Sequence, residues 1–277
     1  MKIITDTSAL YSPQEGQALG IEVLPLHVTI NNQTYTELVD LTTDELIQKI
    51  AEGALPQSSQ PSVGYTVEVL EQYQNEDCLV FTMSEGLPGT YASTVLAKNQ
   101  LEHPEHMHII NTRTLCGPHR HLVDTAIQLN KAGASTQEIV ETINDKMAYT
   151  KSFLIPTDFE FLKRGGRLSP LAAKLGGLLK ITAVLELSDD GKKLDKYAIK
   201  KTESGALKTI IKCYKDMGVD EHAILYVTHA GALMKAKGYA EILRNAFPQT
   251  EIVIHELTPV FVTHGGPGCI AIQMIKK

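Results

Sequence analysis

The sequence has few cysteines and no long hydrophobic run, and both absences exclude whole classes of protein. Its 277 residues contain four cysteines, none in a Cys-x-x-Cys pair, so we expect reduced thiols rather than a disulfide scaffold or a cysteine zinc site. No apolar run approaches the roughly 18 to 20 residues that span a bilayer, and Asp6 interrupts the stretch where a signal peptide would remain apolar. We therefore expect an unprocessed cytoplasmic protein without stable membrane insertion.

An excess of basic residues is also absent. The chain has 26 Lys and Arg residues and 32 Asp and Glu residues, which gives a formal net charge of −6. This balance argues against a nucleic-acid partner. The sequence also lacks Gly-x-Gly-x-x-Gly after a strand, Gly-x-x-x-x-Gly-Lys-Ser/Thr, His-Glu-x-x-His and Gly-x-Ser-x-Gly. No motif therefore supports a nucleotide-cofactor enzyme, a zinc protease or an α/β-hydrolase. We predict no cofactor.

One group of residues keeps a metal site as a less favoured alternative. Five histidines occur within nineteen residues, and imidazole is a common metal ligand. Their spacing across an expected surface loop fits chance composition better, so we predict no metal. The five are His103, His106, His108, His119 and His121.

The first half of the chain alternates short β-branched runs with amphipathic stretches, which predicts a parallel α/β sheet. Capping-box patterns at Thr42 with Glu45, and at Ser135 with Glu138, mark two of the expected helices. The expected strands are residues 2–5, 22–30, 78–83 and 108–111.

The second half of the chain has a different order of expected strands and helices. Two apolar runs at residues 178–187 and 194–200 flank a polar link with a glycine, which predicts a hairpin. A helix around residues 207–214, strands at 223–227, 251–257 and 269–275, and a helix over 232–247 are expected after it. We predict a two-domain α/β protein, with an N-terminal parallel-sheet α/β domain at residues 1–150 and a C-terminal mixed-sheet α+β domain at 151–277.

Polar, glycine-punctuated segments near expected strand ends contain the donors that an anionic ligand needs. Ser58 and Ser59 precede a helix expected from residue 62 or 63, and hydroxyls at a helix N-terminus favour a carboxylate or phosphate. The turn at Gly89 and Thr90 follows a strand and offers spare backbone N–H groups. A capped helix start and an ordinary strand-to-helix turn are the plainer explanations.

Two later segments add a cation and an imidazole. Arg167 follows a Gly-Gly pair, and its planar guanidinium suits a carboxylate or an acyl phosphate; a solvated basic turn is the alternative. His264 precedes a run with three glycines and can hydrogen-bond an anion or act as an acid or base. A purely structural histidine is the plainer explanation.

Taken in order, five such motifs resemble those of the DegV family over essentially the whole chain. Each motif is weak by itself, and the five together in register are specific. They are Ile4-Thr5-Asp6-Thr7-Ser8, Ser58-Ser59-Gln60-Pro61-Ser62, Leu87-Pro88-Gly89-Thr90-Tyr91, Leu162-Lys163-Arg164-Gly165-Gly166-Arg167-Leu168-Ser169 and His264-Gly265-Gly266-Pro267-Gly268.

The resemblance implies a lipid-binding protein rather than an enzyme. DegV-like proteins hold one long-chain fatty acid, such as palmitate or oleate, with the carboxylate between two α/β domains and the chain in an apolar tunnel. Several are the acyl-carrying subunit of a bacterial fatty acid kinase, so a kinase catalytic subunit is the implied protein partner. The carboxylate-binding residues that the resemblance implies are Ser58, Ser59, Gly89, Thr90, Arg167 and His264.

Three departures from the family pattern affect this expectation. Pro88 stands where the family commonly has a serine, so the Gly89 N–H or the Ser84 hydroxyl would replace that donor. Residues 181–183 read Ile-Thr-Ala where Ile-Lys-Pro is usual, and residues 111–112 read Asn-Thr where Asp-Ser is usual. Lipid binding tolerates such changes more easily than partnership with a kinase does.

Enzymatic alternatives stay open on the residues alone. An acyl hydrolase would need a base within about 3 Å of a serine hydroxyl and a third group to orient that base. A small-carbonyl-binding enzyme that uses His264 rests on a looser similarity to dihydroxyacetone kinase substrate domains, which is an analogy of fold.

Overall fold

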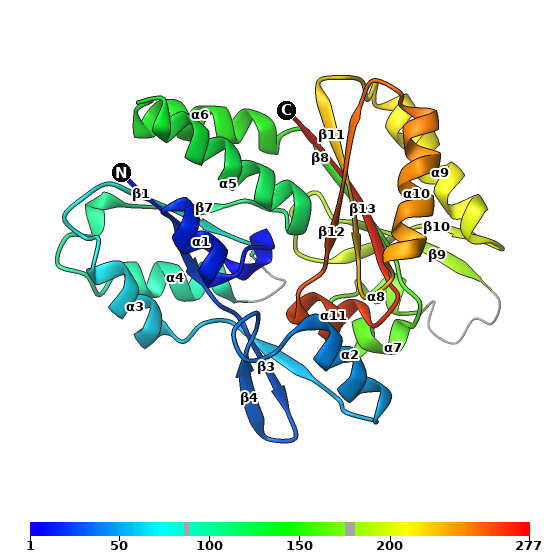
Figure 1. Cartoon of the computed structure of the whole chain (residues 1–277), viewed down its shortest axis with the longest axis horizontal. Coiled ribbons are helices and arrows are strands. Elements are labelled where there is room, and N and C mark those ends of the chain that lie inside the picture. The colour runs from blue at the N-terminus through cyan, green and yellow to red at the C-terminus, as the bar shows by residue number, and fades with distance from the viewer. Residues whose placement is uncertain (86–88, 175–180) are drawn as a thin grey trace.

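The computed structural model describes residues 1–85, 89–174 and 181–277. Its strands form two main sheets and one small sheet, with helices around and between them (Figure 1). The N-terminal sheet is built from the first half of the chain and the larger mixed sheet from the second half. The predicted fold class, a parallel-sheet α/β part followed by a mixed-sheet part, is confirmed.

All four strands of the N-terminal sheet are parallel, in the order β2-β1-β6-β7. The central β6 is buried at every position, as expected for a strand covered on both faces. The strands are β1 (Lys2–Asp6), β2 (Glu22–Leu24), β6 (Cys78–Thr82) and β7 (Met107–Asn111). The helical segments that follow or join them are η1 (Thr7–Ala9), α1 (Pro13–Leu19), α3 (Val63–Glu71), α4 (Thr90–Lys98) and η2 (Pro104–His106).

The expected strand over residues 22–30 is wrong as a single element. It divides into β2 and β3 (His27–Ile30), which belong to different sheets. Pro25 has no N–H to donate to a ladder, and the Leu26 N–H donates to the Thr7 hydroxyl at 3.0 Å instead. The chain therefore leaves the parallel sheet at this point.

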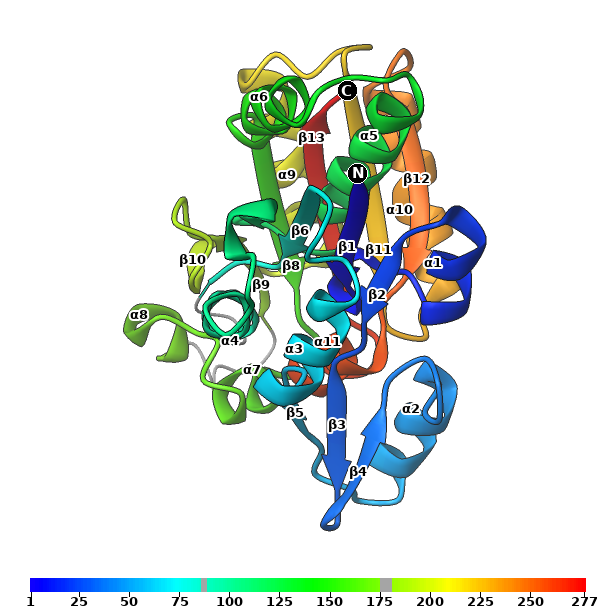
Figure 2. The same cartoon turned by 90° about the vertical axis from the view of Figure 1, so that its left-hand side faces the viewer.

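β3 forms a small antiparallel sheet that the sequence reasoning missed. It pairs with β4 (Gln33–Thr36) and with β5 (Gln57–Ser59), and Figure 2 shows this sheet below the parallel one, beside α2 (Thr43–Ala51). Asn31 and Asn32, both with positive φ, join β3 to β4. An Asn-Asn pair tolerates the left-handed conformation that a tight hairpin requires, so this signal was present in the sequence.

The C-terminal sheet has six strands in the order β10-β9-β8-β13-β11-β12, and only β11 and β12 pair in parallel. The predicted hairpin is present as β9 and β10; the first expected residues of its first strand, 178–180, lie outside the described residues. The strands are β8 (Thr150–Ile155), β9 (Thr182–Leu187), β10 (Leu194–Lys200), β11 (Ala223–His229), β12 (Glu251–Glu256) and β13 (Ile270–Lys276).

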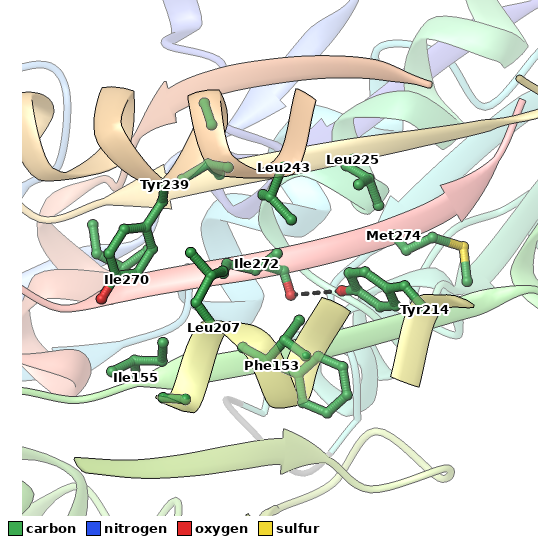
Figure 3. Close-up of a cluster of buried hydrophobic side chains, with 14 of the residues drawn as sticks. Phe153, Ile155, Leu207, Tyr214, Leu225, Tyr239, Leu243, Ile270, Ile272 and Met274 are labelled. Atoms are coloured by element: carbon green, nitrogen blue, oxygen red, sulfur yellow. Dashed lines mark hydrogen bonds between the residues drawn. The ribbon is translucent and has the colours of Figure 1, made fainter. Parts of the chain in front are cut away.

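One face of this sheet packs against α9 (Glu203–Asp216) and α10 (Leu233–Ala246), both near their expected positions. Figure 3 shows the core between them, where Tyr214 and Phe153 lie among aliphatic side chains. The Tyr214 hydroxyl donates to the Ile272 carbonyl at 3.0 Å, so its polar atom is satisfied although the residue is fully buried. Ile270, Ile272 and Met274 of β13 belong to this core, so alternate residues of the strand face away from the N-terminal half.

The opposite face of the C-terminal sheet is covered by α5 (Cys116–Lys131) and α6 (Thr136–Met147). α5 also packs against β1, so that it lies between the two main sheets (Figures 1 and 2). A side chain at Gly117, in its first turn, would meet the ring of Tyr226 at 2.2 Å, so α5 approaches β11 closely. The two sheets are thus held together through a shared apolar core.

The local sequence signals for helix starts agree with the structure. Both predicted capping boxes are present, at Thr42 with Glu45 and at Ser135 with Glu138. Three short helices, α7 (Phe159–Arg164), α8 (Pro170–Ala173) and α11 (Pro259–Gly265), follow β8 or precede β13. Within the described ranges, no helix has the length and apolar character needed to cross a bilayer.

Candidate functional site

A mainly apolar cavity lies between the two halves of the molecule. Met83 and Leu115 line it from the N-terminal half, and strands β8 and β13 with α11 line it from the C-terminal half. Its volume is about 90 Å³, in a measure in which one water molecule needs about 10–15 Å³, so several water-sized groups fit. The lining has only four polar side chains among the described residues: Ser152, Arg167, His264 and Gln273.

Two of the predicted residues meet where His264 forms part of the cavity wall. The Ser58 Oγ lies 2.6 Å from the His264 Nε2, although the two residues are 206 positions apart in the sequence. Ser58 comes from β5 and His264 from the last turn of α11. The expected helix start at Val63 is confirmed, with Ser62 as its cap, but Ser58 lies on a strand rather than at that helix N-terminus.

The glycines around His264 have a clear steric reason. A side chain at Gly165 would lie 2.3 Å from the His264 Nδ1, and one at Gly266 would lie 2.7 Å from the ring of Phe161. Gly266 also has a φ of 77°, which L side chains rarely adopt. The Gly-Gly pair after α7 and the glycines after His264 therefore let α7 and α11 approach each other, with the imidazole between them.

The other end of α11 is held by a buried carboxyl group. The Glu37 Oε2 accepts from the Val260 N–H at 2.9 Å, and its Oε1 accepts from the Thr7 hydroxyl. Burial raises the pKa of Glu37. Because α11 carries His264 in its last turn, this contact ties the position of the imidazole to β1 and to the small sheet. Sequence reasoning missed Glu37, and no motif marked it.

Burial, together with the smaller effect of the Arg167 charge, lowers the pKa of His264 to about 3. His264 is therefore neutral at physiological pH, with a proton on one ring nitrogen. Its Nδ1 is buried and has no hydrogen-bond partner among the described residues. We assign the proton to Nε2, because this tautomer donates to the Ser58 Oγ and leaves the serine hydroxyl free to donate elsewhere.

Arg167 also lines the cavity, close enough for its charge to act on His264, and is half-buried. Its guanidinium donates to the Gly165 carbonyl, and no carboxylate lies within salt-bridge distance in the described ranges. Burial lowers its pKa, but a guanidinium remains protonated in proteins. The cavity wall thus holds a partly desolvated positive charge that lacks an anion.

The remaining predicted site residues, Gly89, Thr90 and Ser59, differ in their burial and in their neighbours. A side chain at Gly89 would lie 3.1 Å from the Gln60 side chain, so the start of α4 lies beside the segment that follows Ser58. Thr90 is buried, and its hydroxyl has no partner within the described part of the chain. Ser59 is exposed, because alternation along β5 turns it away from the face that carries Ser58.

Of the two donors expected to replace the missing family serine, one is available and the other is already hydrogen-bonded. The Ser84 hydroxyl donates to the Gly191 carbonyl at 2.7 Å, so it is already used to hold the β9–β10 hairpin. Gly89 begins α4 without a side-chain cap, which leaves N–H groups of its first turn available. Pro88 itself lies outside the described residues.

A buried polar cluster at the end of β1 was not assigned a role from sequence. Asp6 accepts from the N–H and hydroxyl of Ser8 and from the Met83 N–H, and the Ser8 Oγ lies 2.9 Å from the His119 Nδ1. Burial raises the pKa of Asp6 to about 6 and lowers that of His119 to about 3. The cluster fixes the ends of β1 and β6 next to Met83, which lines the cavity.

The histidines do not gather into one site. His119 is buried against β1, whereas His106 and His108 lie at the surface near Asp77. No group of three or more His, Cys, Asp or Glu side chains with metal-ligand geometry occurs among residues 1–85, 89–174 and 181–277. The metal alternative therefore gains no support.

Comparisons with known proteins agree over the full length. The sequence model described as an uncharacterised protein of the DegV family matches residues 1–277. A DegV domain-containing protein from Halalkalibacterium halodurans is 30% identical over 277 residues, which cover 98% of this chain and 96% of the relative.

Solved structures give the same result. A DegV family protein from Thermus thermophilus, described for its fatty acid binding, has a TM-score of 0.90 and 25% identity, with 100% of this chain and 99% of that chain covered. A fatty-acid-binding DegV family protein from Streptococcus agalactiae has a TM-score of 0.89 and 29% identity, with 100% and 98% covered.

Proposed function

The chain belongs to the DegV family, and from this premise we propose that it binds one long-chain fatty acid in the cavity between its two halves. The observation that carries the proposal is Arg167, a half-buried cation without a carboxylate partner in the described ranges, in the wall of a mainly apolar cavity. A ligand with one anionic end and a long apolar body fits both features. The likeness to fatty-acid-binding relatives supports the same ligand class.

The free energies favour such a ligand. Burying an acyl chain contributes about 0.8 kcal/mol per methylene, so about fourteen methylenes contribute on the order of 10 kcal/mol before the costs of binding. An unpaired carboxylate in the same environment costs several kcal/mol. Charge and hydrogen-bond donors are therefore needed only at the end of the cavity where the carboxylate lies.

The donors at that end have distinct roles in this proposal. The Arg167 guanidinium supplies the charge and donates to the carboxylate. The neutral His264 donates from Nε2 to Ser58, and the Ser58 hydroxyl donates to the carboxylate. Gly89, which lies beside Gln60, adds a backbone N–H, and Thr90 adds a buried hydroxyl. Ser59 takes no part, because it is exposed on the other face of β5.

The carboxylate would lie close enough to the surface for a second protein to reach it. Gly89 and Gly166 are exposed, and Ser58 and Arg167 are half-buried. We therefore propose that the protein carries the acid rather than transforming it, and that a kinase subunit phosphorylates the bound carboxylate. ATP-dependent formation of an acyl phosphate, seen only when this protein, a fatty acid and a kinase subunit are combined, is the corresponding test.

Lipid extraction tests the binding proposal directly. Organic extraction of the purified protein followed by mass spectrometry should give close to one long-chain fatty acid per chain. Protein that is free of lipid and also fails to take up added palmitate or oleate would overturn the proposal.

The contact between Ser58 and His264 favours a second candidate, an acyl hydrolase. Their 2.6 Å separation suits a nucleophile and its base. However, the His264 Nδ1 meets no orienting carboxylate among the described residues, and a pKa of about 3 makes His264 a weak base. Hydrolysis of activated acyl esters that disappears in both Ser58→Ala and His264→Ala would favour catalysis over carriage.

A further inference from the structure

The wall of the cavity carries a buried amide with one unused atom. Gln273 lines the cavity and is 1% exposed. Its Nε2 donates to the Leu115 carbonyl at 3.0 Å and lies 3.2 Å from the Ser152 Oγ. Because a backbone carbonyl can only accept, the amide nitrogen must face Leu115. The Gln273 Oε1 is then the free atom, and it has no hydrogen-bond partner in the described ranges.

A buried acceptor without a donor is costly, and most buried side-chain acceptors in proteins are satisfied. Leu187 and Leu115, which also line the cavity, offer only apolar side-chain atoms. Ser152 contacts the nitrogen side of the amide. Since no donor among the described residues reaches Oε1, this atom is available to a donor on the molecule that occupies the cavity.

Strand β13 gives the distance from the carboxylate end to this amide. A side chain at Gly265, next to His264, would lie 2.6 Å from the Cys269 Sγ, so Cys269 marks the carboxylate end. Cys269, Ala271 and Gln273 line the cavity in turn. Four residues of extended chain span about 14 Å. An extended hydrocarbon advances somewhat less than its ~1.5 Å bond length per carbon, so ~14 Å corresponds to about ten to twelve carbons.

We propose, on the basis of the fatty-acid-binding function above, that Gln273 recognises a hydroxyl group on the acyl chain at about the tenth to twelfth carbon. The hydroxyl donates to Oε1, which satisfies both groups inside the cavity. The preferred ligands are then long-chain hydroxy acids, and Gln273 is a specificity-determining residue for them.

The surroundings of Gln273 are polar enough to suit a hydroxyl group on the ligand. A second, polar pocket adjoins the cavity there and shares Ser152 and Leu187 with it. Arg113, Lys151 and Asp189 are among its other lining residues. A hydroxyl beside Gln273 is thus not surrounded by hydrocarbon on every side, which lowers the cost of removing it from water.

The test compares three ligands that differ at one carbon: octadecanoic acid, 12-hydroxyoctadecanoic acid and 12-methoxyoctadecanoic acid. Delipidated wild-type protein should bind the hydroxy acid about two- to tenfold more tightly than octadecanoic acid. The methoxy acid keeps the oxygen but has no hydrogen to donate, so it should bind less tightly than the hydroxy acid. Equal binding of the hydroxy and methoxy acids, or tighter binding of octadecanoic acid than of the hydroxy acid, would overturn the inference.

Variants add a second readout. Gln273→Met should reverse the order so that octadecanoic acid binds more tightly than the hydroxy acid, whereas Ser152→Ala, which leaves Oε1 in place, should keep the wild-type order. The ligand series in wild-type protein decides the question even where a variant does not fold. Failure to bind any of the three acids would overturn the fatty-acid-binding function itself, a result distinct from binding without preference.

Discussion

The Ser58 hydroxyl and the His264 imidazole form a direct 2.6 Å contact between β5 and α11, two elements from opposite halves of the chain. His264 and Arg167 both line the cavity, and they lie close enough for the charge of Arg167 to act on His264. Because the pKa of His264 is lowered to about 3, the imidazole in this contact is neutral at physiological pH. The site therefore depends on how the two halves are positioned relative to each other.

Arg167→Ala should remove the preference for an acid over the matching alcohol. Loss of a charge-assisted hydrogen bond of about 1.5–3 kcal/mol predicts about tenfold to a hundredfold weaker binding of palmitate. Hexadecanol, which has the same chain but no charge, should be affected little. Arg164→Ala is the matched control, because Arg164 is exposed and stacks over the ring of Phe161 in the same segment. Similar losses for acid and alcohol would show that Arg167 does not bind the carboxylate.

Ser58→Ala should weaken palmitate binding by up to about tenfold, the value of one hydrogen bond. Ser59→Ala should leave binding unchanged, because Ser59 is exposed on the opposite face of the same strand. Titration of delipidated protein with palmitate measures both. If the two variants behave alike, β5 does not present its hydroxyls to the ligand as proposed.

His264 should stay neutral between pH 5 and 8, with its proton on Nε2. Burial and the nearby Arg167 lower its pKa to about 3, so no proton is taken up in this range. Nitrogen-15 NMR of labelled protein reports both the charge and the tautomer, and His264→Gln assigns the signal. A titration midpoint near that of an ordinary histidine would contradict the burial of this ring.

Ala271→Phe should block the acyl chain while leaving the carboxylate end intact. Ala271 lines the cavity between Cys269 and Gln273, and a phenyl ring there fills the space needed by middle carbons. Palmitate affinity should fall at least about tenfold, which corresponds to losing the burial of roughly two methylenes. Butanoate, which is shorter than the ~7 Å that two residues of extended chain place between Cys269 and Ala271, serves as the internal control. Unchanged palmitate binding would place the chain elsewhere.

Asp6→Asn should change the pH dependence of stability. The pKa of Asp6 is raised from 3.8 to about 6 by burial, so the folded state binds a proton more tightly than the unfolded state. The free energy of unfolding therefore falls as pH rises from about 4 to 6, by ~3 kcal/mol for a shift of about two pH units. The variant lacks this contribution, so the difference between wild type and variant in urea titrations should fall across that window. Parallel stability curves would contradict the raised pKa.

Local sequence signals predicted most of the elements that position the site. Two capping boxes, the β9–β10 hairpin and the buried parallel strands lie close to their expected places, because each is decided by a few neighbouring residues. The strand over residues 22–30 failed since Pro25 and a hydrogen bond to Thr7, a distant partner, end it early. The domain boundary near residue 150 remains a prediction.

The sequence alone determined the family and the types of residue at the proposed carboxylate site, because five short motifs retain their order and local chemistry along the chain. Tertiary structure decided which of them meet: it brought Ser58 to His264, turned Ser59 outward, bound Ser84 to Gly191, and left Arg167 without an anion in the described ranges. Strand alternation and the packing of α11 against α7 set these relations. They depend on contacts between residues far apart in the chain, which no local pattern encodes.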